Sequence, residues 1–312
     1  MEERVSFYLA VDAGGTKTEY LLGNDTHELA RVRTGTIKRM RTDDATATRN
    51  LETGLAQLSA STGIAMQTVT STCVGAAGCS VSLVGDWIRA AFAQRVSGSL
   101  CLTGDVDIAL DGAFSGGPGV VVIAGTGSNV AGRGIQGAVT TVGGWGPVLS
   151  DQISGHRVGL QGLRALFLTL DEEQPTILLD AVLEGWQLRD CPALVEYANR
   201  LPAPDFSELA PIVVACARQG DRTALAVLDN EAEEMAHLVH VMIARLRRSV
   251  ADATWLPEVA FAGSMMEHVP LLREAFIAAL RKDLPHLPIR EGVVDPLSGA
   301  LWRARQQAGQ RH

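Results

Sequence analysis

The sequence has no excess of basic residues. Its 27 Lys and Arg face 35 Asp and Glu, which gives the 312-residue chain a formal net charge of −8. Nucleic acids bind to basic surfaces, so we expect no nucleic-acid partner for an acidic chain of this kind. Aromatic residues are also few, whereas the 32 glycines predict many tight turns and close backbone approaches.

Cysteine is scarce and irregularly spaced. The five cysteines are Cys73, Cys79, Cys101, Cys191 and Cys216, and no two of them have the CxxC spacing. A disulfide framework and a structural zinc site are therefore not expected, and reduced thiols in the cytoplasm fit the pattern better. The sequence also lacks a signal-peptide core and any uninterrupted apolar run of about eighteen residues, so we expect a cytoplasmic protein without a membrane partner.

Predicted strands and helices alternate along the chain, as they do in α/β proteins. Strands are predicted at residues 5–11, 20–23, 28–33, 69–74, 99–103, 118–124, 258–262 and 287–290. Helices are predicted at residues 44–62, 81–96, 155–170, 222–247 and 269–282, and from about residue 296 onward. A strand, a glycine-containing turn and a second strand occur twice in this order. The repeat indicates a duplicated α/β unit and two domains.

The first candidate site is Asp12-Ala-Gly-Gly-Thr-Lys-Thr18, which lies between two predicted strands. Its glycines let the backbone approach a phosphate closely, and its amides and threonine hydroxyls can donate hydrogen bonds to phosphate oxygens. Lys17 either adds positive charge or points into solvent. Asp12, at the end of the first strand, is positioned to hold Mg²⁺ directly or through water. The candidate nucleotide-binding residues are Gly14, Gly15, Thr16, Lys17 and Thr18.

A second glycine-containing turn, Gly125-Thr126-Gly127, directly follows another apolar strand. If it faces the first turn across a cleft, it can hold the phosphates of a nucleotide from the opposite side. Small residues also occur where a later strand meets a helix, at Gly263-Ser264. They leave room there for a flat base and a ribose.

Asp105 stands at the carboxyl end of a predicted strand. Phosphoryl transfer to a hydroxyl needs a carboxylate that orients the attacking oxygen and accepts its proton. Asp105 is the favoured candidate for this base, with Asp107 and Asp111 as nearby competitors. A helix that begins near Asp107 would place this residue in its first turn and Asp111 on the surface.

Trp145 is surrounded by three glycines in the segment Gly143-Gly-Trp-Gly146. A Trp in such a flexible setting either lies against the face of a sugar or covers a hinge between domains. Asn129 and Asp151 can exchange hydrogen bonds with sugar hydroxyls. The predicted substrate-binding residues are therefore Asp105, Asn129, Gly144, Trp145, Gly146 and Asp151.

One short segment is basic although the chain as a whole is acidic. Its basic residues are Arg31, Arg33, Lys38, Arg39 and Arg41. The segment is either a solvated face or a contact for an anionic substrate or a phosphate.

Together with Gly75-Ala-Ala-Gly78, these motifs resemble, in their order along the chain, the BadF/BadG/BcrA/BcrD ATPase family and its N-acetylglucosamine kinase-like branch. The resemblance implies the actin-like ATPase fold, an α/β fold with two ribonuclease-H-like lobes and a cleft between them. The expected lobes are residues 1–113 and 114–295. A helical insertion is expected at about 155–250, and the C-terminal helix, at about 296–312, is expected to pack back on the N-terminal lobe.

The resemblance also implies a reaction. The expected activity is transfer of the γ-phosphoryl group of ATP, with Mg²⁺, to a sugar hydroxyl, usually the 6-OH. An amino sugar, first of all N-acetylglucosamine, is the expected substrate, with Asp105 as the base, Asp12 at the metal, and Gly263 and Ser264 at the adenosine. A homodimer is implied as well, with residues 207–250 as a candidate interface.

Two segments depart from the family's pattern and leave alternatives open. Residues 35–41 replace an Asn-containing loop, and Ser150-Asp-Gln-Ile-Ser154 replaces Gly-Asp-Glu-Gly-Ser. Glucosamine and N-acetylmuramic acid are therefore alternative substrates, and the basic segment would recognise the carboxylate of the latter. A further alternative is an ATP-driven activator of a redox enzyme, which would hold an iron–sulfur cluster through cysteines. A sugar-sensing regulator would need an appended DNA-binding segment.

Overall fold

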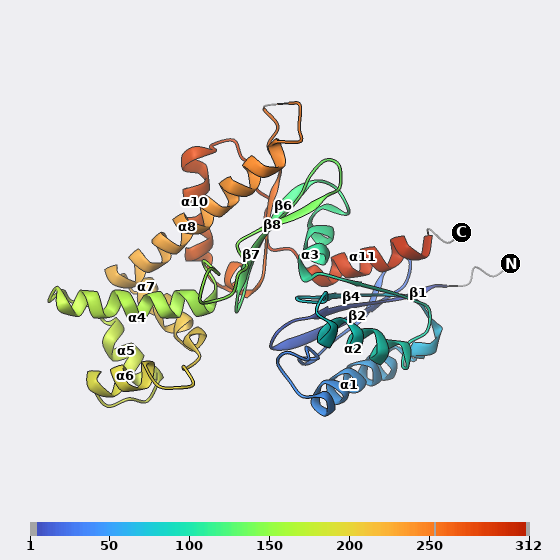
Figure 1. Ribbon diagram of the computed structural model, residues 1–312, viewed down its shortest axis with the longest axis horizontal. Coiled ribbons are helices and arrows are strands. Elements are labelled where there is room, and N and C mark those ends of the chain that lie inside the picture. Colours follow the sequence, from blue (N-terminus) through green and yellow to red (C-terminus); the bar gives the residue numbers. More distant parts are fainter. Residues whose placement is uncertain (1–4, 253, 310–312) are drawn as a thin grey trace. The chain divides into compact units, whose positions relative to one another are not determined.

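The computed structural model describes residues 5–252 and 254–309. The chain forms two units, the first from the segments up to Gly119 and from Val294 onward, and the second from Val120–Val293. Each unit has a β-sheet with helices packed against it (Figure 1). The lobe boundaries that the resemblance implied stay a prediction.

The sheet of the first unit has five strands in the order β3-β2-β1-β4-β5. Its strands are β1 (Phe7–Ala13), β2 (Lys17–Gly23), β3 (Glu28–Gly35), β4 (Val69–Ala76) and β5 (Ser99–Thr103). β1, β2 and β3 are antiparallel neighbours, whereas β4 runs parallel to both β1 and β5. The carboxyl ends of β1, β4 and β5 consequently lie at the same end of the sheet.

Helices cover both faces of this sheet (Figure 1). Along β1, Leu9 and Val11 pack against α1 (Asp44–Thr62) and α2 (Ser82–Ala93). The alternate residues Tyr8 and Ala10 pack against α3 (Asp105–Phe114) and α11 (Pro296–Gly309). Because successive side chains of a strand point to opposite faces, a strand buried on both faces is apolar where it is covered, as β1 is from Phe7 to Val11.

The contact between α3 and α11 depends on two glycines. A Cβ on Gly299 would overlap the carbonyl oxygen of Ile108 and the backbone of Gly112, so the two helices approach each other at backbone distance. An ion pair lies beside this crossing, in which Arg303 Nε donates to Asp111 Oδ2 over 2.6 Å. Asp111 is only 1% exposed. Its predicted place on the surface is therefore wrong, because the last helix covers it and supplies its counter-ion.

The sheet of the second unit has four strands in the order β8-β7-β6-β9. They are β6 (Gly119–Ala124), β7 (Ser128–Arg133), β8 (Val139–Val142) and β9 (Val259–Ala262). The helices of this unit are α4 (Gly155–Asp171), α5 (Leu178–Gly185), α6 (Cys191–Ala198), α7 (Ala210–Arg218), α8 (Arg222–Arg247), α9 (Ser264–His268) and α10 (Pro270–Asp283). No helix within residues 5–252 and 254–309 is long and apolar enough to cross a membrane.

Two details of the sheets differ from the sequence-based prediction. The strand expected at residues 287–290 is reduced to one bridge, in which Ile289 pairs with Val259. Pro285 and Pro288 both precede Ile289, and proline has no N–H to donate to a longer ladder. Conversely, β8 was not expected, because four residues with partly exposed side chains give little hydrophobic signal.

The crossing of α3 and α11 predicts that Gly299→Ala destabilises the protein. The added methyl group has no room, and overpacking of this kind costs about 1–3 kcal/mol. Gly309→Ala in the same helix is the control, since a Cβ there meets no atom within 4 Å and should change stability by less than about 1 kcal/mol. Urea denaturation of the two variants measures the difference. Equal stability would show that the crossing is not closely packed.

Candidate functional site

The carboxylates of Asp12 and Asp105 lie at the same edge of the first sheet. Asp12 pairs with Gly75 of β4, which in turn pairs with Thr103 of β5. Asp105 follows two residues after Thr103 and begins α3. Ligands of open α/β sheets bind outside the carboxyl ends of parallel strands, and this edge is such a place.

Asp12 is partly buried and lies near other acidic groups. Burial raises the pKa of Asp12 to about 7, and the negative charges of Asp105 and Glu19 add to this effect. A divalent cation would relieve this repulsion, so the position suits a metal ion. No three His, Cys, Asp or Glu side chains within residues 5–252 and 254–309 form a metal-binding cluster. Mg²⁺ is usually held by one or two carboxylates, water and substrate phosphates, so Asp12 is a candidate ligand for this ion.

Asp105 combines burial with a fixed orientation. Its Oδ1 accepts a hydrogen bond from the backbone N–H of Val106 over 3.0 Å. Burial raises the pKa of Asp105, although the Val106 N–H and the nearby positive charge of Lys38 act in the opposite direction. Asp107 turns away to accept hydrogen bonds from Thr103 Oγ1 and from the N–H of Gly104, as expected for the first turn of a helix.

The first glycine turn is held by residues that follow β3. Thr36 Oγ1 donates to the carbonyl oxygen of Gly14 over 2.7 Å, and Thr18 Oγ1 accepts from the N–H of Ile37 over 3.0 Å. Gly15 and the neighbouring Thr16 are exposed and thus open to a ligand. Lys17, in contrast, forms an ion pair with Glu19 over 3.0 Å, with 49% of its side chain exposed.

Ion pairs engage most of the basic segment. Arg31 contacts Glu28 and Asp295, and Arg33 contacts Glu19. Arg39 contacts Asp44 over 3.4 Å.

Lys38 behaves differently, because it forms no ion pair with any residue that the structure describes and lies near Asp105. Burial lowers the pKa of Lys38, and the negative charge of Asp105 opposes that shift. Of the basic segment, Lys38 is thus the cation that lies beside the candidate site.

The second unit gathers a second set of predicted residues around Gly125–Gly127. The N–H of Gly125 donates to the carbonyl oxygen of Gly127, and the N–H of Gly155 donates to that of Gly125. A Cβ on Gly127 would meet Asp151 Oδ2 at 2.8 Å, so Asp151 lies directly against the turn. Ser264 is also near, since its Oγ lies 3.7 Å from the place of a Gly125 Cβ.

Asp151 and Asn129 are held by backbone that needs the left-handed conformation. Burial raises the pKa of Asp151, although N–H groups of Gly146 and Ser128 donate to its carboxylate. Asn129 lies against Gly144, whose φ of 69° favours glycine and whose Cβ would clash with the amide. The buried Oδ1 of Asn129 accepts no hydrogen bond from the described residues. It is therefore available to a donor on a ligand.

The structure also defines the surroundings of Trp145 and Gly263, two further predicted site residues in the second unit. Trp145 is 76% exposed, so its ring is free to stack on a ligand. Gly263 has a φ of 94°, and a Cβ there would overlap the carbonyl oxygen of Ala124 at the end of β6. Only glycine fits this place, where β9 turns into α9.

The BadF/BadG/BcrA/BcrD ATPase family matches residues 9–301. The chain belongs to this family. The N-acetylmuramic acid/N-acetylglucosamine kinase of Clostridium acetobutylicum is 24% identical over 311 residues, which cover 97% of this chain and 99% of that protein.

Two solved structures show which fold the chain has. One, provisionally assigned as an N-acetylglucosamine kinase from Chromobacterium violaceum, has a TM-score of 0.74 at 24% identity and covers 95% of this chain and 98% of its own. The other, a ROK family glucokinase from Streptomyces griseus in complex with glucose and AMPPNP, has a TM-score of 0.64 at 15% identity and covers 97% and 100%. The predicted actin-like ATPase fold is thereby confirmed.

Glu231 of α8 supports residues 151–154, the segment that carries Asp151. Sequence patterns alone did not single out this residue. Its carboxylate accepts hydrogen bonds from the N–H of Ile153 over 2.9 Å and from Arg157 Nε over 2.8 Å. Ile153 and Asp151 both have a positive φ, so the loop needs such an anchor. The one signal in the sequence is an acidic residue among the apolar positions of a long helix.

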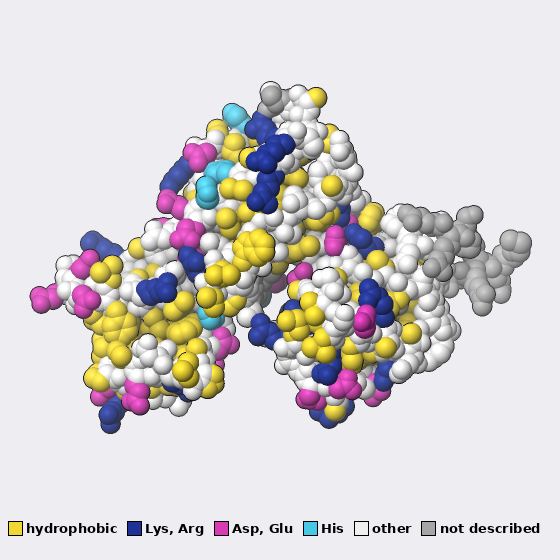
Figure 2. Space-filling model, in the orientation of Figure 1, with side chains coloured by type: hydrophobic (Ala, Val, Ile, Leu, Met, Phe, Trp, Pro, Cys, Tyr) yellow, Lys and Arg dark blue, Asp and Glu magenta, His cyan; other side chains and the backbone are white. Residues whose placement is uncertain are grey.

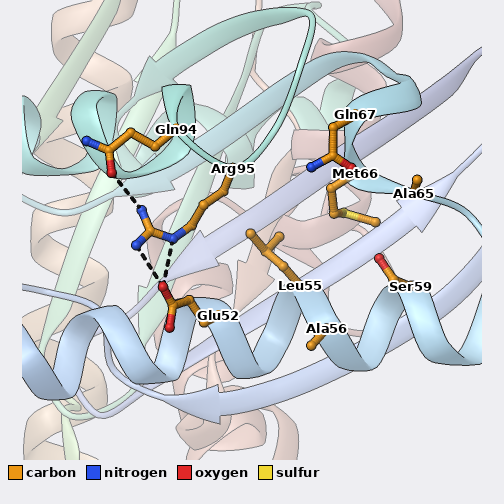
Figure 3. Close-up of a pocket in the computed structure, with 9 residues that line it drawn as sticks. All are labelled: Glu52, Leu55, Ala56, Ser59, Ala65, Met66, Gln67, Gln94 and Arg95. Carbon is orange, nitrogen blue, oxygen red and sulfur yellow. Dashed lines mark hydrogen bonds and ion pairs between the residues drawn. The ribbon is translucent and has the colours of Figure 1, made fainter.

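A groove of about 430 Å³ in the first unit is distinct from these residues (Figure 3). Leu55 and Ala56 of α1 line one side of it, and residues 65–67 and 94–95 line the other. These two short segments precede β4 and β5, so the groove lies at the amino ends of the parallel strands. The candidate site lies at their carboxyl ends.

Glu231→Ala should destabilise the second unit and loosen residues 151–154. The change leaves a buried N–H without an acceptor and removes a charged partner of Arg157, which costs about 3 kcal/mol. Glu234→Ala is the matched control, because Glu234 contacts the same arginine but is half exposed, and its pair is worth less than about 1 kcal/mol. Thermal unfolding measures the loss of stability, and hydrogen exchange at the Ile153 amide measures the loosening of the loop. Equal changes in Glu231→Ala and Glu234→Ala would contradict the anchoring role of Glu231.

Proposed function

We propose that this protein is an ATP-dependent kinase that transfers a phosphoryl group to a hydroxyl of an amino sugar, with N-acetylglucosamine as the first candidate. The observation that carries the proposal is Asp105, a partly buried carboxylate with a raised pKa that begins α3 close to Asp12. Family membership and the Clostridium acetobutylicum relative support the same activity.

In this proposal the first unit holds the phosphates and the metal ion. Gly14, Gly15 and Thr16 donate hydrogen bonds to ATP, while Lys17 adds charge from its ion pair with Glu19. Thr18, in contrast, is fully buried and supports the turn through its hydrogen bond with the Ile37 N–H. Asp12 holds Mg²⁺, for which its burial among acidic groups is suited. When bound, the metal ion supplies charge neutralisation on the transferred phosphoryl group.

Asp105 is the proposed general base. It orients the attacking sugar hydroxyl, most simply the 6-OH, and accepts its proton as the new O–P bond forms. A raised pKa makes the carboxylate a stronger base, while the neighbouring Lys38 favours its ionised form. The two effects thus act in opposite directions on the same carboxylate.

The proposed roles of the second unit follow from its cluster around Gly125–Gly127. This turn binds nucleotide phosphates through its backbone and Thr126, and Gly263 with Ser264 receives the adenosine. Asn129 and Asp151 bind sugar hydroxyls, where the buried Asn129 Oδ1 offers an open acceptor. Trp145 stacks on the sugar, flanked by Gly144 and Gly146, whose backbones lie close to the ligand.

N-acetylmuramic acid is the second candidate substrate, and Lys38 is the observation that favours it. This sugar carries a carboxylate, and Lys38 is a half-buried cation beside the proposed base. A cation in such surroundings attracts an anion more strongly than one in water does. Glucosamine carries a positive charge instead and would be repelled by the same side chain.

A cytoplasmic homodimer completes the proposal. The five cysteines are free, as expected for a reducing compartment. Figure 2 shows hydrophobic side chains gathered over α5 and the neighbouring part of α4. Leu168, Ile177 and Val195 are among the exposed apolar residues of this region, which is therefore a candidate interface in addition to residues 207–250.

Asp105→Asn should abolish sugar-dependent ATP turnover and leave nucleotide binding intact. An amide cannot accept the proton, and loss of a general base lowers kcat by about a hundredfold or more. Asp107→Asn is the matched control, because an amide oxygen can still accept the hydrogen bonds of Thr103 and Gly104, so turnover should remain within a few-fold. Turnover and nucleotide affinity are measured together. Near-normal turnover of Asp105→Asn would overturn the assignment.

Lys38→Met should shift substrate preference away from the anionic sugar. If Lys38 binds the carboxylate, kcat/KM falls about tenfold more for N-acetylmuramic acid than for N-acetylglucosamine, which is the value of one charged hydrogen bond. Any effect of Lys38 on Asp105 itself lowers kcat/KM for both sugars, so it cancels in the ratio of the two kcat/KM values. Arg33→Met is the control, because Arg33 is exposed and already paired with Glu19. An equal loss for both sugars would rule out recognition of the carboxylate by Lys38.

A further inference from the structure

Cys73 and Cys101 lie side by side in the first sheet. They are Cα partners on the parallel neighbours β4 and β5, and both side chains are on the face that α3 and α11 cover. Neighbouring strands are about 4.8 Å apart, and disulfide-linked residues have Cα atoms about 4.4–6.8 Å apart. Both thiols are free, so the pair has the spacing of a disulfide without the bond.

The two thiols differ in accessibility. Cys73 lies on an inner strand and is completely buried, whereas Cys101 lies on β5, at the edge of the sheet, and is partly exposed. A small oxidant can therefore reach Cys101 first. Cys73 is then protected from solvent but remains next to its partner.

Arg303 makes the surroundings of Cys101 electropositive. The Cys73 thiol and the Arg303 guanidinium both lie close to the Cys101 sulfur. Together with the positive charge of Arg303 they lower the pKa of Cys101 to about 6, although burial and Asp107 act in the opposite direction. The same contact between the thiols and burial raise the pKa of Cys73. Asp111 holds the guanidinium in place through its 2.6 Å ion pair.

We propose that Cys101 and Cys73 form a peroxide-reactive dithiol, in which Cys101 is the attacking thiolate and Cys73 the resolving thiol. In the first step the Cys101 thiolate attacks hydrogen peroxide, the O–O bond breaks, and with one proton the products are a sulfenic acid and water. In the second step the Cys73 sulfur attacks the sulfenic acid, its proton leaves with the hydroxyl group as water, and the disulfide forms. Two thiols are oxidised and one peroxide is reduced to two waters.

The two cysteines lie on β4 and β5, close in sequence to the ends of these strands where the candidate site lies. The proposed thiol chemistry does not depend on the residues of that site. Asp105 follows four residues after Cys101, and Gly75 follows two residues after Cys73. Oxidation also removes the thiolate that faces Arg303. The dithiol can be tested without any assay of kinase activity, so failure of the proposed function leaves it untouched.

The test is oxidation of the full-length protein with a small molar excess of hydrogen peroxide, followed by mass spectrometry. We expect the loss of two hydrogens, a Cys73–Cys101 peptide in the digest, and recovery of the starting mass after treatment with a dithiol reductant. Oxidation that begins at Cys79 or Cys191, or a wild-type protein that keeps a free Cys73 after oxidation, would overturn the proposal.

Two serine variants separate the roles of the thiols, and a third serves as the control. Cys73→Ser should stop at a sulfenic acid on Cys101, which a dimedone probe traps, whereas Cys101→Ser should form neither product. Cys79→Ser should behave as the wild type, because burial and nearby acidic groups raise the pKa of this thiol. The mass measurement on the wild type decides the question even if a variant folds poorly. Rapid disulfide formation in Cys101→Ser would contradict the assignment.

Discussion

Two partly buried carboxylates, Asp12 and Asp105, lie at the carboxyl ends of parallel strands, and the surrounding residues of the first unit are arranged around them. Asp12 and Asp105 lie at the same end of the sheet, and burial raises the pKa of each. The negative charges of Asp105 and Glu19 raise the pKa of Asp12 further, and the charge of Asp107 raises that of Asp105. Charges in such a place need compensation from a cation. Lys38 is the cation that the chain itself brings to Asp105, and the acidic surroundings of Asp12 suit a metal ion. The unfavourable burial of these negative charges favours the binding of a positively charged ligand such as a metal ion.

In the second unit, polar side chains lie directly against glycines. Gly127 and Gly144 have no side chain, and Asp151 and Asn129 occupy the space that a Cβ would fill. The loop that carries Asp151 has backbone in the left-handed region and is anchored from below by Glu231. Helix α8 thereby positions the segment that carries Asp151, and residues of a binding site generally need such support.

Sequence patterns predicted the elements of the fold well and the ion pairs poorly. The helix at 222–247 and the glycine turns after β1 and β6 were found because hydrophobic periodicity and glycine are local signals. Asp111 was expected on the surface, because its partner Arg303 is 192 residues away and only folding brings the two together.

The sites show the same limit of local signals. Asp12, Asp105 and Asp151 were recognised as candidates from the motifs around them. Glu231 was not, since its one signal is its place among the apolar positions of α8, a helix that also carries Asp229, Glu233 and Glu234. The basic segment is the intermediate case, in which the sequence predicted the charges but not that Arg31, Arg33 and Arg39 are engaged by acidic neighbours.

The central claim is transfer of a phosphoryl group from ATP to an amino sugar, and product analysis tests it most directly. The protein is incubated with ATP, Mg²⁺ and N-acetylglucosamine, N-acetylmuramic acid, glucosamine, N-acetylmannosamine or glucose, with a sugar-free control, and the products are identified by phosphorus NMR. The account predicts that an amino sugar phosphate and ADP form in equal amounts. Formation of ADP and inorganic phosphate at the same rate with and without every sugar would contradict it.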